Sequence, residues 1–192
     1  MSPAEHADLP VAARVRRFEE RVIAAGLATE AGLDGFLDAF LRDAAPVNGA
    51  RLVARAWTDP AFRERLLADG RAAAAELGIE AGYRLQVVEN TAAVHNVIVC
   101  TLCSCYPVRL LGPSPSWYKS AAYRARVVRE PRAVLAEFGL ELPPGTEIAV
   151  WDSSSEARYL VLPRRPDGTA GAGEEALAGL VTREGLIGTA PV

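Results

Sequence analysis

The 192-residue sequence has no long apolar run, no run of basic residues and only three cysteines. A membrane helix needs about 20 consecutive apolar residues, so no membrane association is predicted. The net charge of −3 and the lack of Lys-rich or Arg-rich runs argue against a nucleic-acid-binding protein. The polar, acidic start at residues 1–6 lacks the apolar segment of a signal peptide, which predicts a cytoplasmic location.

The three cysteines all lie between residues 100 and 105, in the spacing C-x-x-C-x-C. In a reducing compartment they are not expected to form structural disulfides. Single buried cysteines are common in protein cores, but three at a chelating spacing are not. The cluster therefore predicts a metal site, and no organic cofactor is predicted beside it.

The first eighty residues show apolar residues at helical spacing. They predict a helix over residues 10–25, a second helix that ends before Pro46 and a third that includes residues 52–57. Asp59 and Pro60 suit the N-cap and first position of a fourth helix, which continues or restarts over residues 71–77. Half of the residues are hydrophobic, which suits one domain with an appendage.

After Gly82 the apolar pattern changes to the period of a strand. The predicted elements are strands at 85–88, 94–99, 146–151 and 158–162, and helices at 117–129, 131–138 and 174–182, with a polar turn at 152–155 between the last two strands. The fold class is therefore α+β. Residues 1–80 are predicted to form a helical N-terminal arm and residues 81–192 an α+β metal-binding catalytic domain.

The spacing of the cluster allows five protein atoms to bind one metal. Cys103 and Cys105 flank Ser104, so a metal bound to both sulfurs lies over the backbone nitrogens of Ser104 and Cys105. If those amides lose their protons, four donors share a plane and Cys100 can supply a fifth thiolate below it. Zinc prefers tetrahedral sites with two separated ligand pairs, and no second pair exists here. The donors suit a late transition metal, and the open sixth position is typical of catalysis.

Residues 99–105, Val-Cys-Thr-Leu-Cys-Ser-Cys, resemble the metal-binding claw of nitrile hydratase α subunits. Further similar segments follow in the same order between residues 80 and 190, at 89–91, 94–97, 117–120, 123–124, 129–131, 158–163 and 186–188. The resemblance implies a helical arm followed by a layered α-β-β-α domain, and hydration of an organic nitrile to its amide. Thr101 marks the cobalt type, which implies one Co(III) per chain rather than Fe(III).

The resemblance also implies roles for individual residues. Cys103 would be oxidised to a sulfinate and Cys105 to a sulfenate, which is reasonable chemistry for coordinated thiolates. Arg158 matches an α-chain arginine beside the claw, and Tyr106 would line the pocket, so Cys105, Cys103, Arg158 and Tyr106 are the predicted catalytic residues. The implied partner is a nitrile hydratase β subunit, single or split into two chains, with a possible activator chaperone.

The sequence departs from the family after the claw. The family usually has Pro-Trp-Pro-Val-Leu-Gly-Leu-Pro-Pro there, whereas residues 107–115 lack the tryptophan and contain Arg109. A glutamine is also expected where this chain has Ala81 and Gly82. Both changes predict a larger, more polar nitrile, of the nucleoside type that toyocamycin nitrile hydratase uses in secondary metabolism. Arg109 by itself is interpreted as a solvated surface charge rather than a substrate contact.

Other interpretations stay open. The γ subunit of thiocyanate hydrolase has a similar claw, and a non-catalytic cobalt- or zinc-binding module would need only the ligands. His95 is interpreted as a hydrogen-bonded core histidine rather than a ligand, and Arg158 could be a surface arginine. Trp117, Tyr118 and Tyr123 are interpreted as packing or subunit-interface residues.

Overall fold

The computed structural model describes residues 10–103 and 105–192. The chain divides into two compact units, Met1–Asp43 and Ala44–Val192. The predicted boundary near residue 80 marks the change from helices to strands, and the helices between residues 46 and 76 belong to the same compact unit as the strands. No helix among the described residues has both the length and the apolar character needed to span a membrane.

The first unit contains two helices, α2 (Val11–Ala24) and α3 (Glu30–Asp43). The predicted helix over residues 10–25 is confirmed, and Gly26 follows α2 with a φ of +67°, which suits the end of a helix. The predicted apolar stripe on α2 is exposed: Val11 and Phe18 are 72% and 68% accessible. The apolar side chains that predict this helix are therefore not buried against the other described residues of this unit.

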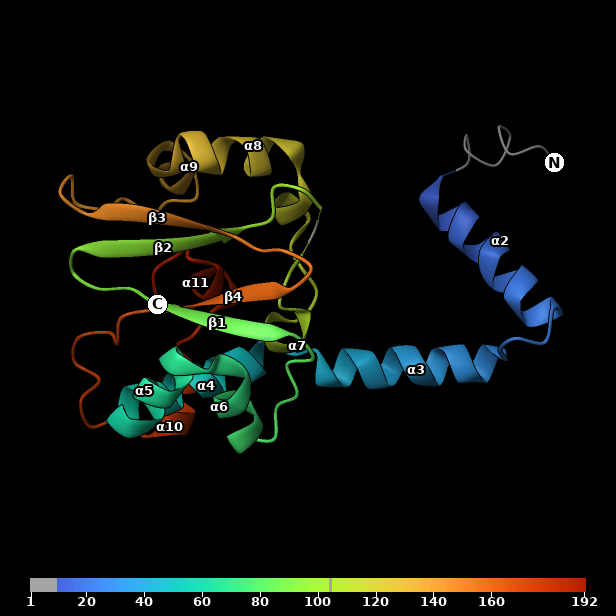
Figure 1. Cartoon of the computed structure of the whole chain (residues 1–192), viewed down its shortest axis with the longest axis horizontal. Helices are drawn as coiled ribbons and strands as arrows, with labels where there is room; N and C mark the ends of the chain where they lie inside the picture. The colour runs from blue at the N-terminus through green and yellow to red at the C-terminus, as the bar shows by residue number, and fades with distance from the viewer. Residues whose placement is uncertain (1–9, 104) are drawn as a thin grey trace. The chain divides into compact units, whose positions relative to one another are not determined.

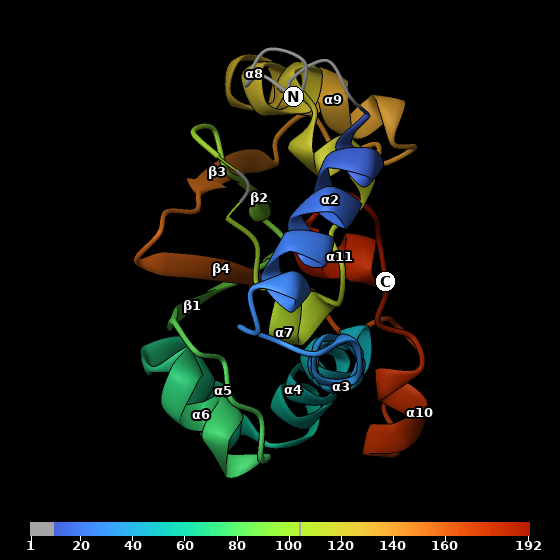
Figure 2. The ribbon, with the colours of Figure 1, turned by 90° about the vertical axis from the view of Figure 1, so that its right-hand side faces the viewer.

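The second unit has the predicted layered architecture (Figure 1). Strand β1 (Arg84–Glu89) pairs in parallel with β4 (Ala157–Leu162), and β2 (Val94–Val99) pairs in parallel with β3 (Glu147–Asp152). Helices α8 (Ala121–Arg129) and α9 (Pro131–Glu137) lie over the β2–β3 pair. On the other side, α4 (Pro46–Thr58), α5 (Pro60–Ala68) and α6 (Gly70–Glu76) lie below the β1–β4 pair, as Figure 2 also shows. The predicted α+β class is confirmed.

Side-chain caps start several of these helices where the sequence predicts them or close by. The carboxylate of Asp59 accepts a hydrogen bond of 3.0 Å from the Phe62 amide at the start of α5, with Pro60 in the first position. Asp69 caps α6 in the same way through Ala72. Ser120 starts α8, which is why the predicted helix over 117–129 is divided into a 3₁₀ turn, Ser116–Lys119, and a helix.

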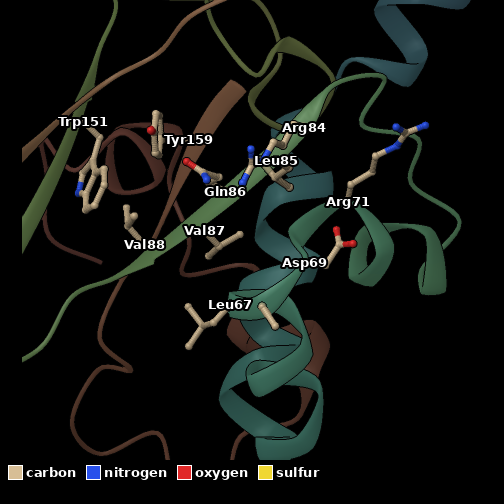
Figure 3. Close-up of a pocket in the computed structure, with 11 residues that line it drawn as sticks. Leu67, Asp69, Arg71, Arg84, Leu85, Gln86, Val87, Val88, Trp151 and Tyr159 are labelled. Atoms are coloured by element: carbon tan, nitrogen blue, oxygen red, sulfur yellow. The ribbon is translucent and has the colours of Figure 1, made fainter. Parts of the chain in front are cut away.

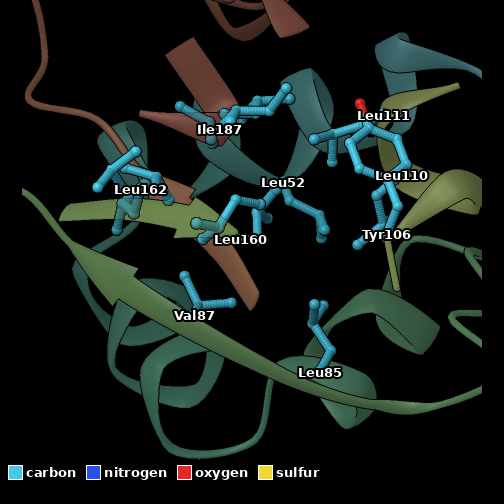
Figure 4. Packing of buried hydrophobic residues seen from close by; sticks show 14 of the residues in the cluster. Leu52, Leu85, Val87, Tyr106, Leu110, Leu111, Leu160, Leu162 and Ile187 are labelled. Atoms are coloured by element: carbon cyan, nitrogen blue, oxygen red, sulfur yellow. The ribbon is translucent and has the colours of Figure 1, made fainter. Parts of the chain in front are cut away.

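The core is formed where the helices meet the two strand pairs (Figure 4). Leu52 of α4, Leu160 of β4 and Ile187 of α11 (Arg183–Ile187) are all fully buried. Each such side chain contributes about 1.5–3 kcal/mol through the burial of its apolar surface. Leu110 and Leu111 of the short helix α7 (Val108–Leu111) are also fully buried, so the segment that follows the cysteine cluster is anchored in this core.

Two short helices were not predicted, α7 and α11, because four or five residues are too few to show a helical period. The predicted last helix over 174–182 ends earlier, as α10 (Glu174–Ala178). Thr182 then caps α11 by accepting a hydrogen bond from the Gly185 amide. The polar turn at 152–155 is confirmed, but it joins β3 and β4, which belong to different strand pairs.

His95 belongs to a buried polar network on β2, as the sequence predicts. One ring nitrogen lies 2.7 Å from the carbonyl oxygen of Gly188, and the other lies 3.3 Å from the side-chain nitrogen of Asn90. The Asn90 side-chain oxygen in turn accepts a hydrogen bond from the Asn96 amide. Burial lowers the pKa of His95, and the hydrogen bond to Gly188 opposes this shift only in part.

The lowered pKa of His95 predicts acid destabilisation. Below its ordinary value of 6.5, the unfolded chain binds a proton at this position that the folded chain does not. The contribution of neutral His95 to the free energy of unfolding is therefore fully present above pH 6.5 and is lost as the pH decreases. The His95→Gln variant should be less stable at pH 7.5 by about 1–3 kcal/mol, with a flatter decline between pH 7 and 5. Urea unfolding across this range measures both effects.

The matched control is His6→Gln, which removes the other histidine of the sequence. Its pH profile should coincide with that of the unmodified chain. Equal slopes for the His95→Gln variant and the unmodified chain would show that His95 is not the group responsible.

Candidate metal centre

The three cysteines lie where β2 ends. Cys100 follows Val99, the last residue of β2, and Val99 pairs in register with Asp152 at the end of β3. The turn after Asp152 is short, so β4 starts at the same end of the molecule. Parallel pairing of β4 with β1 then places Arg158 opposite Leu85, near the start of β1. The site therefore combines the carboxyl ends of one strand pair with the amino ends of the other.

The sulfur atoms of Cys100, Cys103 and Cys105 converge on one point. The Sγ atoms of Cys100 and Cys103 are 3.3 Å apart, those of Cys103 and Cys105 are 3.0 Å apart, and all three lie within 4.8 Å of one another. The Cys103 amide also donates to the Cys100 sulfur at 3.3 Å. Cys100 and Cys105 are buried, whereas Cys103 is exposed, so the cluster has one open side.

Three side chains outside the cysteine loop hold its backbone. The Asp152 carboxylate accepts hydrogen bonds from both the amide (2.9 Å) and the hydroxyl of Thr101. Arg124 donates to the Cys103 carbonyl at 2.7 Å, and Tyr118 donates to the Cys105 carbonyl at 3.1 Å. Three of these four hydrogen bonds involve a charged side chain, and such hydrogen bonds are stronger than neutral ones. The loop conformation that gathers the thiols is thus fixed from several directions.

Burial and neighbouring thiols keep the Cys105 thiol protonated when no metal ion is bound. Burial and the hydrogen bond to Cys103 raise the pKa of the Cys105 thiol to about 12, and the nearby guanidinium of Arg158 opposes this rise. A bound metal ion reverses that direction, because it stabilises the thiolate directly. Ionisation of the Cys105 thiol is therefore unfavourable without a metal ion and favourable when the sulfur binds one.

The residues present fit a thiophilic transition metal. Three sulfurs within bonding reach of one point are soft donors, suited to cobalt, iron or zinc rather than to magnesium or calcium. Cys100, Cys103 and Cys105 can supply these donors. The predicted ligand Ser104 lies outside the described residues.

A family model described as nitrile hydratase, alpha chain, matches residues 9–190. The chain belongs to the nitrile hydratase α-chain family. It is 53% identical over 184 residues to the cobalt-containing nitrile hydratase subunit alpha of Pseudonocardia thermophila, which covers 94% of this chain and 90% of the relative. The solved structure of a double mutant of the Fe-type nitrile hydratase from Comamonas testosteroni Ni1 superimposes with a TM-score of 0.88 at 45% identity, over 93% and 88% of the two chains.

A relative with another activity is also similar. The thiocyanate hydrolase subunit gamma of Thiobacillus thioparus is 46% identical over 158 residues, which cover 76% of this chain and 65% of the relative. Both the identity and the coverage are lower than for the cobalt-containing nitrile hydratase subunit. The fold and the cysteine cluster are consistent with either activity, and the extent of the similarity favours the nitrile hydratase branch of the family.

The other predicted site residues lie beside the cluster. Tyr106 is buried directly after Cys105, with its ring edge against Tyr118 at 4.9 Å between centroids. The charge of Arg158 acts on Cys105, and its guanidinium carbon lies 5.5 Å from the ring centre of Tyr83. His95 lies on β2 and its ring contacts Gly188 and Asn90 instead.

Sequence reasoning missed the residues that fix the loop, namely Asp152 and Arg124, and it assigned Tyr118 to packing. Asp152 could be found in principle, because the carboxyl ends of parallel strands meet at one edge. That inference requires the β2–β3 pairing, which no local pattern reveals. Arg124 lies on α8, far from the cysteines in sequence, and only tertiary structure brings it to the Cys103 carbonyl.

A separate pocket of about 580 Å³ lies between α5, α6 and β1 (Figure 3). Its lining includes Asp69, Arg71, Arg84 and Gln86, with Trp151 and Tyr159 at one end. None of the three cysteines lines it. This pocket is therefore distinct from the metal centre.

Removal of the Asp152 charge should loosen the cysteine loop. The Asp152→Asn variant weakens two hydrogen bonds to Thr101, each of which is worth about 1.5–3 kcal/mol with a charged acceptor. In metal-free protein, we expect Ellman's reagent to modify the buried thiols of Cys100 and Cys105 about tenfold faster or more. Stopped-flow absorbance at 412 nm measures the reaction, and the slow phases report these two buried thiols.

Asp167→Asn is the matched control, since Asp167 is an exposed aspartate in a loop outside the site. It should leave the slow phases unchanged. An Asp152→Asn variant with the same rates as the control would show that Asp152 does not restrain the loop.

Proposed function

We propose that the chain is the metal-carrying α subunit of a cobalt nitrile hydratase and hydrates an organic nitrile to its amide. The observation that carries the proposal is the convergence of three sulfur atoms within 4.8 Å, at the end of β2 and with one exposed side. The family membership supplies the reaction class. Thr101 supports cobalt, and so does the cobalt in the names of two relatives that are 53% and 51% identical to this chain.

Cys100, Cys103 and Cys105 would hold one Co(III) per chain, with the backbone nitrogens of Ser104 and Cys105 as further donors. When bound, the ion supplies Lewis-acid activation of the nitrile or of water. The protein residues orient and enclose this centre. Tyr118 and Arg124 fix the carbonyl groups of Cys105 and Cys103 by hydrogen bonds, and the buried Tyr106 directly follows the buried ligand Cys105.

The proposal includes oxidation of two cysteines by dioxygen or a peroxide, Cys103 to the sulfinate by four electrons and Cys105 to the sulfenate by two. Oxidation adds oxygen atoms that accept hydrogen bonds and carry negative charge. Arg158 is the α-chain cation whose charge already acts on Cys105, so it would stabilise the oxidised form. The Cys105 sulfenate oxygen would then be positioned as nucleophile or base.

A nitrile hydratase β subunit would complete the site. Leu102, at the tip of the cysteine loop, is 90% exposed, and the apolar stripe of Val11, Val15 and Phe18 on α2 is exposed as well. Burial of these side chains against a partner removes apolar surface from water. Burial of Leu102 would also close the open side of the cluster. The split form of the β subunit, an activator chaperone, a cytoplasmic location and a nucleoside-type substrate stay predictions.

Thiocyanate hydrolase activity is the alternative within the same family, supported by the similar γ subunit. The two reactions give different products. We expect the complex of this chain with its β subunit to form amides from nitriles, measured by liquid chromatography. Release of carbonyl sulfide from thiocyanate without amide formation would contradict the proposal.

Metal analysis combined with mass spectrometry tests the centre directly. We expect one cobalt ion per chain by plasma emission, two added oxygens on Cys103 and one on Cys105 in peptides from the native protein. The Cys103→Ser/Cys105→Ser double variant should lose cobalt and hydration together, because two of three thiolate donors are gone.

Circular dichroism shows whether the double variant remains folded, and Arg71→Gln, an exposed arginine on α6, serves as the control that keeps both metal and activity. Tetrahedral zinc on three unmodified thiols would instead favour a structural metal-binding module and would contradict the catalytic proposal.

A further inference from the structure

Strand β3 pairs with β2 along one of its two edges. In a parallel pair, the main-chain N–H and C=O groups of successive residues point alternately to the two edges of a strand. The amides of Glu147 and Ser153 donate to carbonyl groups at either end of β2, at 2.8 and 2.7 Å. The odd-numbered residues of β3 therefore face β2. The main-chain groups of Ile148, Val150 and Asp152 face the opposite edge, which we call the outer edge of β3.

The outer edge is unpaired within the described part of the chain. Among residues 10–103 and 105–192, no main-chain or side-chain group bonds to the N–H or C=O of Ile148 or Val150 on this side. Both residues keep part of their surface accessible. Their side chains and that of Trp151 pack against the core, and α8 and α9 lie over the strand pair (Figure 1). The strand is thus held by its two faces, while its edge stays accessible.

The other strands use or bury the corresponding edges. On β2, the amide of Asn96 and the carbonyl of Ile98 bond to side chains outside the strand, at 2.7 Å each. On β4, Val161 is fully buried. On β1, α6 lies against the carbonyl oxygen of Leu85, which would be 2.9 Å from a Cβ added at Gly70. The outer edge of β3 has neither a partner nor such a cover among the described residues.

The sequence of β3 does not protect this edge against pairing. Edge strands are commonly protected by proline, by lysine, by a bulge or by a very short length. Here six residues pair with β2 in continuous register. The four central residues, 148–151, are uncharged and include no proline. An extended segment of another chain can therefore add to this edge through main-chain hydrogen bonds.

The surface beside the edge leaves room for such a segment. An open depression of about 760 Å³ lies between α9 and the start of β3. The side chains of α9 that line it include Pro131, Ala133 and Ala136, which are small enough to let a further backbone approach. The added strand would thus have a partly apolar surface on which to rest its own side chains.

Charge at the two ends of β3 decides which kind of chain fits. The strand begins with Glu147 and ends with Asp152, and both are exposed. A second copy of this chain would bring these acidic residues together, whether the two strands ran parallel or antiparallel. Like charges opposite each other destabilise a strand pair. The edge therefore favours a different chain, one with basic residues near the ends of its strand.

We propose that the outer edge of β3 pairs with an extended segment of the β subunit, which adds as a third strand and places a basic side chain near Glu147. This inference rests on the proposed function, which names the β subunit as the partner. The Asp152 carboxylate binds Thr101 in the cysteine loop, and the next residue, Leu102, is 90% exposed. A strand on this edge is therefore continuous with the open side of the metal centre.

Hydrogen–deuterium exchange resolved to single amides tests the pairing. In the complex with the β subunit, the outward amides of Ile148 and Val150 should exchange about 100-fold more slowly, or slower still, than in the chain alone. The inward amides of Ala149 and Trp151 bond to β2 and should be slow in both samples. Outward amides that exchange in the intact complex as fast as those of an unstructured peptide would overturn the proposal.

Charge reversal at Glu147 tests the chemistry of the partner. Glu147→Lys should raise the Kd for the β subunit about 3- to 10-fold at low salt, measured by surface plasmon resonance. The effect should shrink at high salt, which screens exposed charges. The matched control is Glu175→Lys, at an exposed glutamate of α10 on the far side of the strand layers from α8 and α9 (Figure 1). It should leave the Kd unchanged, and an equal Kd for the two variants would contradict a basic side chain near Glu147.

Neither measurement depends on activity, so the pairing and the proposed function can fail separately. A complex with protected outward amides that hydrates no nitrile would contradict the proposed function and still support the pairing. Amide formation by a complex whose outward amides stay unprotected would do the reverse. Self-association of the chain in gel filtration, with the same amides protected, would identify a second copy as the partner and would overturn the proposal.

Discussion

Three sulfur atoms held 3.0–3.3 Å from their neighbours are the constraint on which the rest of this structure depends. Burial first, and then the hydrogen bond to Cys103, raises the pKa of Cys105, so this thiol becomes a thiolate readily only when a cation stabilises it. The fold meets the constraint by fixing the backbone rather than the side chains. Asp152, Arg124 and Tyr118 come from three different elements, and each binds a backbone group of the cysteine loop.

The layered architecture makes these restraints possible. Because β2 and β3 are parallel, the loop after β2 and the residue that ends β3 lie at one edge, and Asp152 reaches Thr101 from there. Because β4 follows β3 after a short turn, Arg158 enters from the opposite strand pair. Tyr123 of α8 donates to the carbonyl of Ile98 at 2.7 Å, which ties the helical layer to the strand that carries the cluster.

The sequence predicts the parts of this site that depend on local spacing. The cysteine cluster, the α+β class, the cap at Asp59 and the polar environment of His95 all follow from residue type and period, and the structure confirms them. The pairing of strands, the role of Asp152 and the reach of Arg124 depend on which distant segments meet. Residue spacing does not contain that information. Short helices such as α7 are not predicted for a different reason. Four residues are too few to show a helical period, and two buried leucines in a row do not distinguish a helix from a strand.

The segment after the claw shows how stability and specificity can be assigned to neighbouring residues. Leu110 and Leu111 are fully buried and hold α7 against α4, where an added Cβ at Gly49 would be 2.9 Å from the Leu110 carbonyl oxygen. That packing leaves almost no freedom for the backbone of α7. The Arg109 side chain extends from the same turn to Gly82, where an added Cβ would be 3.7 Å from its Nε atom. The core therefore fixes the turn that carries Arg109, while separate hydrogen bonds from Asp152, Arg124 and Tyr118 fix the cysteine loop.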